Sequence, residues 1–368
     1  MHQKTKLKEK KKILICPLNW GLGHASRDIP LINQLLKNNF EVIIAADKSP
    51  LQLLRLEFPN LKWERFPSYQ VTYSKNRILA FKMFFSIPTI ILGIYKEHKL
   101  LKTIIKKWEI DIVISDNRFG LWNKNIYTIF ITHQIMIKPP RWLKYSEYPL
   151  YRLNRLIILK FNKCWIPDFD KRINLTGDLS HKYKIPANAN FIGPLSRFSP
   201  PSFESEIITT YYEILVLLSG PEPQRTIFEN LLIKQLTPTG LKTLIVRGIS
   251  GKTDNLHTEK NIMIIPHLPM VKLQNAILSS KIIICRSGYS TIMDLITLRK
   301  KAILVPTPGQ TEQEYLANYF KEKGIFYSII QQKFDLSTAL NNYKAFKKDF
   351  PLLSSDSIQQ EIKLLKAL

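Results

Sequence analysis

The sequence of 368 residues has few of the features that tie a protein to disulfides, metal ions or a membrane interior. Its three cysteines, Cys16, Cys164 and Cys285, lie far apart and none belongs to a CxxC pair. Each falls in or beside an apolar run, where cysteine usually packs as a small hydrophobic residue. No apolar run is long enough to span a bilayer, and the basic N-terminal segment lacks the pattern of a signal peptide. We therefore expect a protein of the reducing cytoplasm that is soluble or lies on a membrane surface.

Three familiar site motifs are also missing. The sequence has no Walker loop, no zinc-ligand pattern and no DxD pair that would hold a metal ion. We therefore expect chemistry that uses neither a metal ion nor a separate cofactor.

Acidic residues are scarce relative to basic ones. The chain contains 54 Lys and Arg residues against 29 Asp and Glu residues, a formal net charge of +25. Such a charge favours anionic partners, which include nucleic acid, an anionic membrane surface and a phosphorylated substrate. Because Lys, Ile and Asn are abundant together, a compositional bias of the genome explains the charge equally well.

Strand and helix patterns alternate along nearly the whole chain, which indicates an α/β protein with parallel sheets. The alternation stops between Gly193 and Ser205, where prolines and serines occur without periodicity. We therefore predict a domain of residues 1–195, a linker of residues 196–205 and a second domain of residues 206–368. Whether the last helix packs back on the first domain is left open.

The predicted elements fall into two series. The strands are expected at Lys12–Leu18, Glu41–Ala46, Leu61–Phe66, Asp111–Ser115, Tyr127–Thr132, Lys163–Ile166, Asn190–Ile192, Glu213–Leu218, Lys242–Val246, Asn261–Ile265, Lys281–Cys285 and Ala302–Val305. The helices are expected at Ile29–Lys37, Leu51–Phe58, Trp142–Leu159, Gln224–Gln235, Ser337–Phe346 and Ser357–Leu365, with a further basic helix ending near Lys107.

Residues 281–318 contain two successive strand-to-helix turns, at Ser287-Gly288 and at Pro308-Gly309. In a parallel sheet both following helices point their N-termini at one crevice. Free N–H groups and the positive end of the helix dipole make such a crevice suitable for a phosphate. Asp294, one turn inside the first helix, is well placed to accept two sugar hydroxyls. A phosphorylated sugar or a nucleotide is the expected ligand.

The same stretch resembles the donor-site signature of the MurG-type glycosyltransferases. The resemblance rests on Arg286-Ser287-Gly288, Thr291, Asp294 and the later Pro306 and Gln313. It implies that the residue at position 294 holds the ribose of UDP and that Gln313 helps to hold the donor sugar. The family usually has Glu at position 294, so Asp shortens the reach to the ribose. The resemblance also implies the GT-B architecture, two Rossmann-like domains facing each other over a cleft.

The turn after the first strand carries a second resemblance. Gly21 and Gly23 allow a close approach of the backbone to a ligand, and His24 falls at the start of a helix. This loop resembles the glycine-rich loop of MurG-like enzymes, and the pattern from Gly23 to Arg27 also resembles related UDP-sugar hydrolases. His24 can take a proton from an attacking hydroxyl or steady a pyrophosphate. The sequence does not separate these roles.

Two further candidates end strands of the first domain. Asp116 follows one strand and His133 the next, and strand carboxyl ends face the ligand crevice in open α/β sheets. Either residue is a candidate for the base or for a hydrogen bond to the acceptor. The competing interpretation is an Asp that caps a loop with a His packed beside it.

The remaining donor-site candidates lie in the second domain. Ser219, Gly220 and Arg225 occupy the place of the family's phosphate loop, although Pro221 and Pro223 lack the N–H groups of such a loop. The resemblance implies that backbone groups near Leu268 bind the base of the nucleotide. The full set of expected donor-binding residues is Ser219, Gly220, Arg225, Leu268, Arg286, Ser287, Gly288, Thr291, Asp294, Gln310 and Gln313.

Two stretches, Arg77–Trp108 and Arg141–Lys163, interleave apolar and aromatic residues with Lys and Arg. An amphipathic, basic surface of this kind suits an anionic bilayer. A core helix with a solvated basic face is the alternative interpretation.

Together these patterns predict a glycosyltransferase that moves a sugar, such as N-acetylglucosamine, from a UDP-sugar to an acceptor hydroxyl. The resemblance implies an inverting reaction, and the acceptor is expected to be lipid- or glycan-linked. A UDP-sugar hydrolase of the same fold is the nearest alternative. A basic nucleic-acid-binding protein is an alternative of another class, which the charge alone suggests and no RNA or DNA motif supports.

Overall fold

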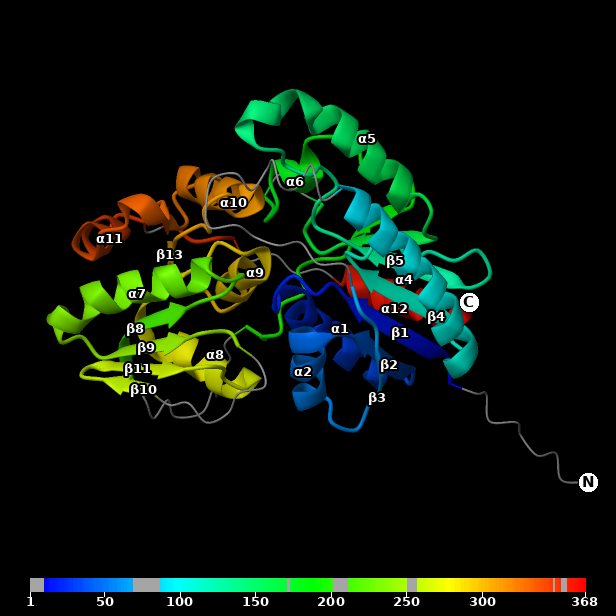
Figure 1. Cartoon of the computed structure of the whole chain (residues 1–368), viewed down its shortest axis with the longest axis horizontal. Coiled ribbons are helices and arrows are strands. Elements are labelled where there is room, and N and C mark those ends of the chain that lie inside the picture. The colour runs from blue at the N-terminus through cyan, green and yellow to red at the C-terminus, as the bar shows by residue number, and fades with distance from the viewer. Residues whose placement is uncertain are drawn as a thin grey trace, which may run out of the picture.

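The computed structural model describes residues 10–68, 87–170, 173–200, 211–249, 257–346, 348–351 and 356–368. These residues form two α/β units, each built on a seven-stranded sheet with helices packed against it (Figure 1). Every strand pair of the first sheet is parallel, and the second sheet has one antiparallel pair, β10 with β11. The predicted α/β class is confirmed.

The first sheet has the order β3-β2-β1-β4-β5-β6-β7. Its strands are β1 (Lys12–Pro17), β2 (Glu41–Ala46), β3 (Lys62–Arg65), β4 (Ile112–Asp116), β5 (Tyr127–Ile131), β6 (Lys163–Ile166) and β7 (Ala189–Phe191). Its helices are α1 (Gly23–Lys37), α2 (Lys48–Glu57), α4 (Ile87–Trp108), α5 (Glu147–Ile158) and the short α6 (Asp178–His181), and a 3₁₀ segment, Arg141–Ser146, precedes α5.

The strand β1 illustrates why the strands of this sheet are continuous apolar runs. Ile13 and Ile15 pack in a core on one face of the sheet, whereas Leu14 and Cys16 pack in a core on the other. Both faces are therefore buried, as expected for a parallel sheet. The strand order reverses between β1 and β4, and ligands bind outside the carboxyl ends of strands at such a point.

The second sheet has the order β10-β11-β9-β8-β12-β13-β14. Its strands are β8 (Tyr212–Leu217), β9 (Thr243–Val246), β10 (His257–Glu259), β11 (Ile262–Ile265), β12 (Ser280–Cys285), β13 (Ile303–Leu304) and β14 (Tyr327–Ser328). Its helices are α7 (Gln224–Leu236), α8 (Met270–Ser279), α9 (Tyr289–Thr297), α10 (Thr311–Glu322) and α11 (Leu336–Tyr343), with 3₁₀ segments at Thr237–Thr239 and Gln331–Lys333. Here the order reverses between β8 and β12.

The last helix, α12 (Ser357–Ala367), returns to the first unit, where it lies beside α1 (Figure 1). Ile358, Ile362 and Leu365 join the core that covers one face of the first sheet. The indole of Trp165 donates a hydrogen bond to Glu361 at 2.9 Å. The chain therefore crosses between the two units twice.

The structure differs from the predicted elements in several places. The helix predicted from Ile29 begins at Gly23, because the glycine-rich turn itself enters the helix. The helix predicted over Trp142–Leu159 is divided into the 3₁₀ segment and α5, since Leu143 leaves the helical region at φ −106° and ψ 23°. The elements α8, β10 and β14 were not predicted.

Parts of two predicted segments, residues 77–86 of the basic apolar stretch and residues 201–205 of the linker, lie outside the described residues. Among the helices that the structure does describe, none combines the length and the apolar character needed to cross a membrane.

Candidate active site

The two units meet where the N-termini of α1 and α9 face each other (Figure 1). The hydroxyl of Ser290 on α9 donates to the carbonyl of Gly23 on α1 at 2.8 Å. A β-carbon at position 23 would lie 3.2 Å from that hydroxyl, so glycine permits the close approach. Gly21, two residues earlier, has a φ of +101°, which only glycine adopts without strain. The glycine-rich turn thus brings the start of α1 against the second domain.

His24 and Asp116 form one hydrogen-bonded pair. Nδ1 of His24 lies 3.0 Å from Oδ1 of Asp116, which is fully buried at the end of β4. Burial alone would raise the pKa of Asp116, but Arg27 and His24 outweigh it through charge and hydrogen bonding and hold that pKa well below its usual range. An ionised carboxylate only accepts, and Nη2 of Arg27, which lies 3.0 Å from the same Nδ1, already donates to Oδ1 of Asp116, so we assign the proton of His24 to Nδ1. Nε2 is left with a lone pair, on a side chain that is 14% exposed.

This arrangement bears on the predicted choice of base. Both oxygens of Asp116 are occupied, by His24 and by Arg27, whose Nε lies 2.7 Å from Oδ2 and whose Nη2 bonds Oδ1. The described residues place no hydrogen-bond partner on Nε2 of His24, so the pair presents a histidine nitrogen and no carboxylate oxygen for an acceptor.

Arg27 extends the pair to His133. Nη1 of the buried Arg27 lies 2.9 Å from Nδ1 of His133. A guanidinium only donates, so Nδ1 of His133 accepts and its proton is on Nε2. Burial lowers the pKa of His133, and the charge and hydrogen bond of Glu312 offset this only in part, so the imidazole is neutral at pH 7.

His133 also reaches across to the second domain. Its Nε2 donates to Oε1 of Glu312 at 2.8 Å, and Nε2 of Gln134 donates to Oε2 of the same carboxylate at 2.5 Å. The ring of Tyr289, on α9, stacks on the ring of His133 at 4.2 Å with an interplanar angle of 4°. Sequence reasoning missed Glu312 as a site residue. The available signal was its place in the polar start of α10, directly before Gln313.

Several residues expected to bind the donor instead hold the surrounding turns. The guanidinium of Arg286 is buried over the Phe228 ring and donates to the carbonyls of Val305 at 3.1 Å and Gln224 at 2.9 Å. Burial lowers its pKa to about 9, which leaves it charged at pH 7. Arg286 therefore ties together the turns that follow β8 and β13, and its predicted part in donor binding stays a prediction.

Ser287 and Gln313 play a similar part. Ser287 Oγ donates to the carbonyl of Gln313 at 2.8 Å, and Oε1 of Gln313 accepts from the backbone N–H of Thr307 at 2.9 Å. Both side chains are buried. They fix the turn after β13 relative to the start of α9.

The remaining groups at these turns are backbone N–H groups and small hydroxyls. Gly220 has a φ of +93°, and a β-carbon there would lie 3.6 Å from the hydroxyl of Thr307. That hydroxyl is buried and has no hydrogen-bond partner among the described residues. Gly288 precedes the first turn of α9, where Thr291 is half-buried, and Gln310 precedes α10. Ser219 is half-buried beside Gly220. Phosphate would therefore meet N–H groups and small hydroxyls here.

Asp294 is bonded to residues of the predicted linker. It is buried, and its carboxylate accepts hydrogen bonds from Ser196 Oγ at 2.9 Å and Arg197 Nε at 3.0 Å. Both donors belong to the predicted linker. Burial raises the pKa of Asp294, against the opposing effect of Arg197 and Ser196. The carboxylate predicted to face a ribose is thus occupied by the linker.

Two predicted residues lie apart from this group. Arg225, in the first turn of α7, pairs with Glu222, with Nη2 2.5 Å from Oε1. Leu268 packs against the core of the second unit, next to α8. Neither is brought to the His24 pair.

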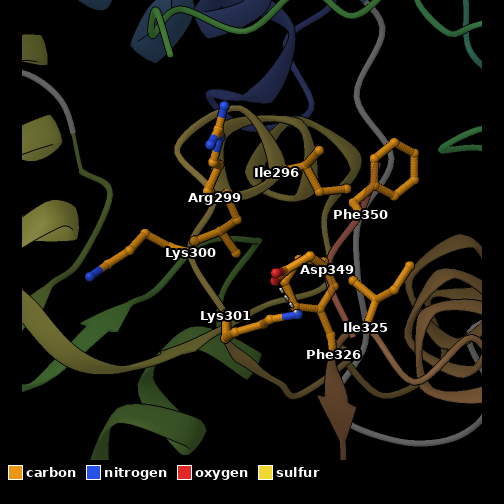
Figure 2. Close-up of a pocket in the computed structure, with 9 residues that line it drawn as sticks. Ile296, Arg299, Lys300, Lys301, Ile325, Phe326, Asp349 and Phe350 are labelled. Atoms are coloured by element: carbon orange, nitrogen blue, oxygen red, sulfur yellow. Dashed lines mark ion pairs between the residues drawn. The ribbon is translucent and has the colours of Figure 1, made fainter. Parts of the chain in front are cut away.

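A separate cavity of about 240 Å³ lies beyond Asp294 on α9. An ion pair between Lys301 and Asp349, 3.0 Å long, crosses it, and Phe350 closes one side (Figure 2). The side chains of Arg299 and Lys300 point away from that ion pair (Figure 2). None of the predicted site residues lines this cavity.

Residues 234–363 match the family model described as the glycosyltransferase family 28 C-terminal domain. This chain is a glycosyltransferase of the GT-B type. An uncharacterized glycosyltransferase of Methanosarcina acetivorans is 23% identical, over 85% of this chain and 84% of that protein. The UDP-N-acetylglucosamine–N-acetylmuramyl-(pentapeptide) pyrophosphoryl-undecaprenol N-acetylglucosamine transferase of a Thermoanaerobacter species is 32% identical, but over only 29% of this chain and 31% of that enzyme.

Solved glycosyltransferases share the whole architecture. MurG of Acinetobacter baumannii superposes with a TM-score of 0.55 at 13% identity, covering 98% of this glycosyltransferase and 100% of that chain. The calicheamicin glycosyltransferase CalG4 gives a TM-score of 0.61 at 12% identity, with 98% of each chain covered. At these identities the likeness concerns the fold. The predicted GT-B architecture and the resemblance to MurG-type enzymes are confirmed.

Proposed function

We propose that this glycosyltransferase transfers a sugar from a UDP-sugar to an acceptor hydroxyl, with His24 as the general base. The observation that carries the proposal is the His24–Asp116 pair, set where the N-terminus of α1 meets that of α9. The relatives named as UDP-N-acetylglucosamine transferases support a UDP-sugar, and N-acetylglucosamine in particular. A glycosyltransferase of the same fold, SsfS6, has been solved with thymidine diphosphate, another nucleoside diphosphate.

The proposed reaction is a single displacement. The acceptor hydroxyl gives its proton to Nε2 of His24 while its oxygen forms a bond to the anomeric carbon. The bond from that carbon to the UDP oxygen breaks, and its electron pair leaves with UDP, so the configuration inverts. Asp116 stabilises the imidazolium that forms, because its carboxylate already accepts from Nδ1.

The leaving diphosphate needs compensation for its charge. We place it at the N-terminus of α9, beside Gly288 and the Ser219-Gly220 turn, where helix N–H groups and the dipole favour an anion. The Gln313–Thr307 hydrogen bond keeps the neighbouring turn in place. This assignment needs no metal ion.

Asp294 remains our candidate for the ribose, with one added condition. Its oxygens are held by Ser196 and Arg197, so ribose hydroxyls would have to replace these donors. Donor binding on this view moves the start of the linker.

We further propose that the acceptor is lipid-linked and that the first domain rests on an anionic membrane. The α4–α5 surface, as we name it, exposes apolar and aromatic side chains beside basic ones. It comprises Ile91, Leu92, Tyr95, Lys96, Lys99, Trp142, Tyr145, Tyr148, Arg152, Leu153, Leu156 and Lys160. Trp122 joins its two parts, since it stacks on His98 of α4 at 4.2 Å and lies under the ammonium of Lys160 at 5.1 Å. Such a surface suits an anionic bilayer.

The test is a panel of UDP-sugars incubated with the protein, with and without a bacterial lipid extract, measured by release of UDP. We expect slow release alone and much faster release with lipid. The His24→Ala variant should lose about 100-fold or more, since general-base catalysis contributes roughly 100- to 10,000-fold. His181→Gln is the matched control, because His181 also pairs with a carboxylate, Asp168, at 3.3 Å.

Two outcomes would count against the proposal. Full turnover by a folded His24→Ala variant would remove His24 as the base. Fast turnover in plain buffer, unchanged by any lipid or sugar acceptor, would indicate the UDP-sugar hydrolase.

A further inference from the structure

His133 belongs to the first domain, yet its ring is held by the second. Tyr289 stacks on one face at 4.2 Å, and Glu312 accepts from Nε2 at 2.8 Å. The hydroxyl of Tyr289 in turn donates to the carbonyl of Pro167 in the first domain, which fixes the stacked ring. The position and tautomer of this imidazole therefore depend on groups that reach it only when the domains are in contact.

On its other side, His133 is linked to the catalytic pair by hydrogen bonds of defined direction. Nε2–H of His133 donates to Glu312, Arg27 donates to Nδ1 of His133, and Arg27 also donates to Asp116. Asp116 accepts from Nδ1–H of His24. Nη2 of Arg27 also lies 3.0 Å from Nδ1 of His24, but it donates to Asp116, and with this assignment the chain from Glu312 to His24 has one consistent set of donors and acceptors. Reversing one histidine tautomer would break it.

The charges around this chain come from every neighbouring element. Arg27 and Asp28 come from α1, Asp116 from β4, and Glu312 from α10, while the phenol of Tyr289 on α9 faces Arg27 and is kept neutral by burial. Asp28 has no hydrogen-bond partner in the described part of the chain, and burial together with Asp116 raises its pKa. Arg27 is therefore the cation that faces both Asp116 and His133. A displacement of its guanidinium leaves Asp116 without its main partner.

We propose that Glu312 and His133 are positioning residues that hold the His24–Asp116 pair in its productive orientation only while the donor domain is docked. The inference rests on the proposed function, because it assigns these residues a part in the base assignment. When Glu312 is removed, Nε2 of His133 loses its acceptor and the proton can move to Nδ1. Nδ1–H would then face the donor Nη1 of Arg27, donor against donor, and Arg27 would withdraw from His133 and shift on Asp116.

The kinetic test compares Glu312→Ala with Glu312→Gln. The amide oxygen of Gln can still accept from Nε2–H of His133, so Glu312→Gln should stay within about threefold of wild type, whereas Glu312→Ala should lose about 10- to 100-fold in kcat, the cost of a misplaced catalytic group. The KM for the UDP-sugar should change little in either variant. Glu314→Gln is the control, an exposed carboxylate in the same helical turn.

A second variant shows whether the effect passes through His133. Asn at position 133 places an oxygen near the Nδ1 position, so His133→Asn keeps an acceptor for Arg27 but loses the contact with Glu312. In that background Glu312→Ala should have no further effect on kcat. Additive losses in the double variant, or a raised KM with unchanged kcat in Glu312→Ala, would overturn the proposal and indicate that Glu312 contacts the substrate directly.

The third readout needs no turnover. Selective ¹⁵N labelling of the seven histidines, assigned by single substitutions, reports the tautomer of each ring in the substrate-free protein. We expect Nε2–H at His133 and Nδ1–H at His24 in wild type, and changed signals for both rings in Glu312→Ala. Unchanged His24 signals would overturn this inference even in an active transferase. Changed signals in a protein without transferase activity would refute only the proposed function.

Discussion

At the scale of single residues, two neighbouring carboxyl groups have pKa values shifted in opposite directions. Asp116 keeps a low pKa because Arg27 and His24 donate to it. Asp28 is buried, neither of its oxygens has a hydrogen-bond partner among the described residues, and burial together with the charge of Asp116 raises its pKa well above the usual range. Carboxyl groups whose pKa values are pushed apart in this way are typical of active sites.

Asp28→Asn should therefore make the protein more stable at neutral pH. A carboxyl whose folded pKa is raised contributes full stability below its unfolded pKa, about 3.9 for Asp, and loses it as the pH rises through the folded pKa. Asn has no ionisable side chain, so the variant does not lose this stability as the pH rises. The unfolding free energy of Asp28→Asn relative to wild type should rise from about pH 4 upward and level off above the folded pKa, as measured by urea denaturation across pH. A flat difference, like that expected for the exposed Asp170→Asn, would mean that Asp28 is ionised in the fold.

The sequence identified the residue types of the site better than their partners. His24 and Asp116 were alternatives for one role, yet they form one unit because β1 and β4 are adjacent although the two residues are 92 positions apart. Arg286 and Asp294 were expected to meet a ligand, and the sequence did not indicate that each also bonds protein groups from distant loops. The tertiary fold decides which group becomes the hydrogen-bond partner of a side chain, and no local sequence pattern encodes that partner.

At the scale of elements, the start of the linker acts as a hydrogen-bonding segment. Ser196 and Arg197 lie just past β7 and bind Asp294 on α9, so the linker is attached to the helix whose N-terminus we assign to the diphosphate. A nucleotide that uses Asp294 competes with this contact. The linker residues and the ligand therefore favour different states of the same carboxylate.

Arg197→Ala should bind UDP more tightly than wild type. Removal of the competing donor frees the carboxylate, and a gain of about 1 kcal/mol, or roughly fivefold in Kd, is the scale of one such hydrogen bond. Titration calorimetry with UDP measures it. Asp294→Ala serves as the opposite control and should weaken UDP binding by about 1.5–3 kcal/mol. Weaker binding by Arg197→Ala would instead place Arg197 among the ligands of the nucleotide.

Helices and strands were predictable where a long run or a regular spacing of apolar residues marked them. The strands next to the two sheet centres were found because their runs of Ile, Leu and Val are buried on both faces. The edge strands β10 and β14 escaped prediction because they are three and two residues long and depend on their neighbours for definition. The predicted start of α1 lay too far along the sequence because Gly23 and His24 were assigned to a turn.

At the scale of the whole molecule, the two crossings of the chain tie the domains together near the site. The first crossing carries Ser196 and Arg197, and the second precedes α12, whose Glu361 accepts from Trp165 in the first domain. Between them, Glu312 and Tyr289 meet His133. The base, the diphosphate turn and the linker therefore all lie at one domain interface, so domain movement alters them together.

Our membrane proposal uses the net charge of +25 only where basic residues lie beside exposed apolar groups. The α4–α5 surface combines both. Leu153 and Leu156 are 55% and 57% exposed, Arg152 directly precedes Leu153, and Lys160 follows Leu156 by four residues. Insertion of one such leucine into a bilayer is worth about 1.5 kcal/mol or more, roughly tenfold in binding.

The protein should therefore bind vesicles that contain phosphatidylglycerol, and it should bind less as NaCl screens the basic residues. The double variant Leu153→Asp, Leu156→Asp should lose about 100-fold or more, since two apolar contacts are removed and two like charges meet the lipid. Val271→Asp on α8 is the matched control, because Val271 is 59% exposed but lies on the second domain. Co-sedimentation measures all three proteins. If the leucine variant still binds vesicles in a salt-sensitive way, charge alone attracts the protein to the membrane. In that case lipid should still stimulate UDP release by the same variant.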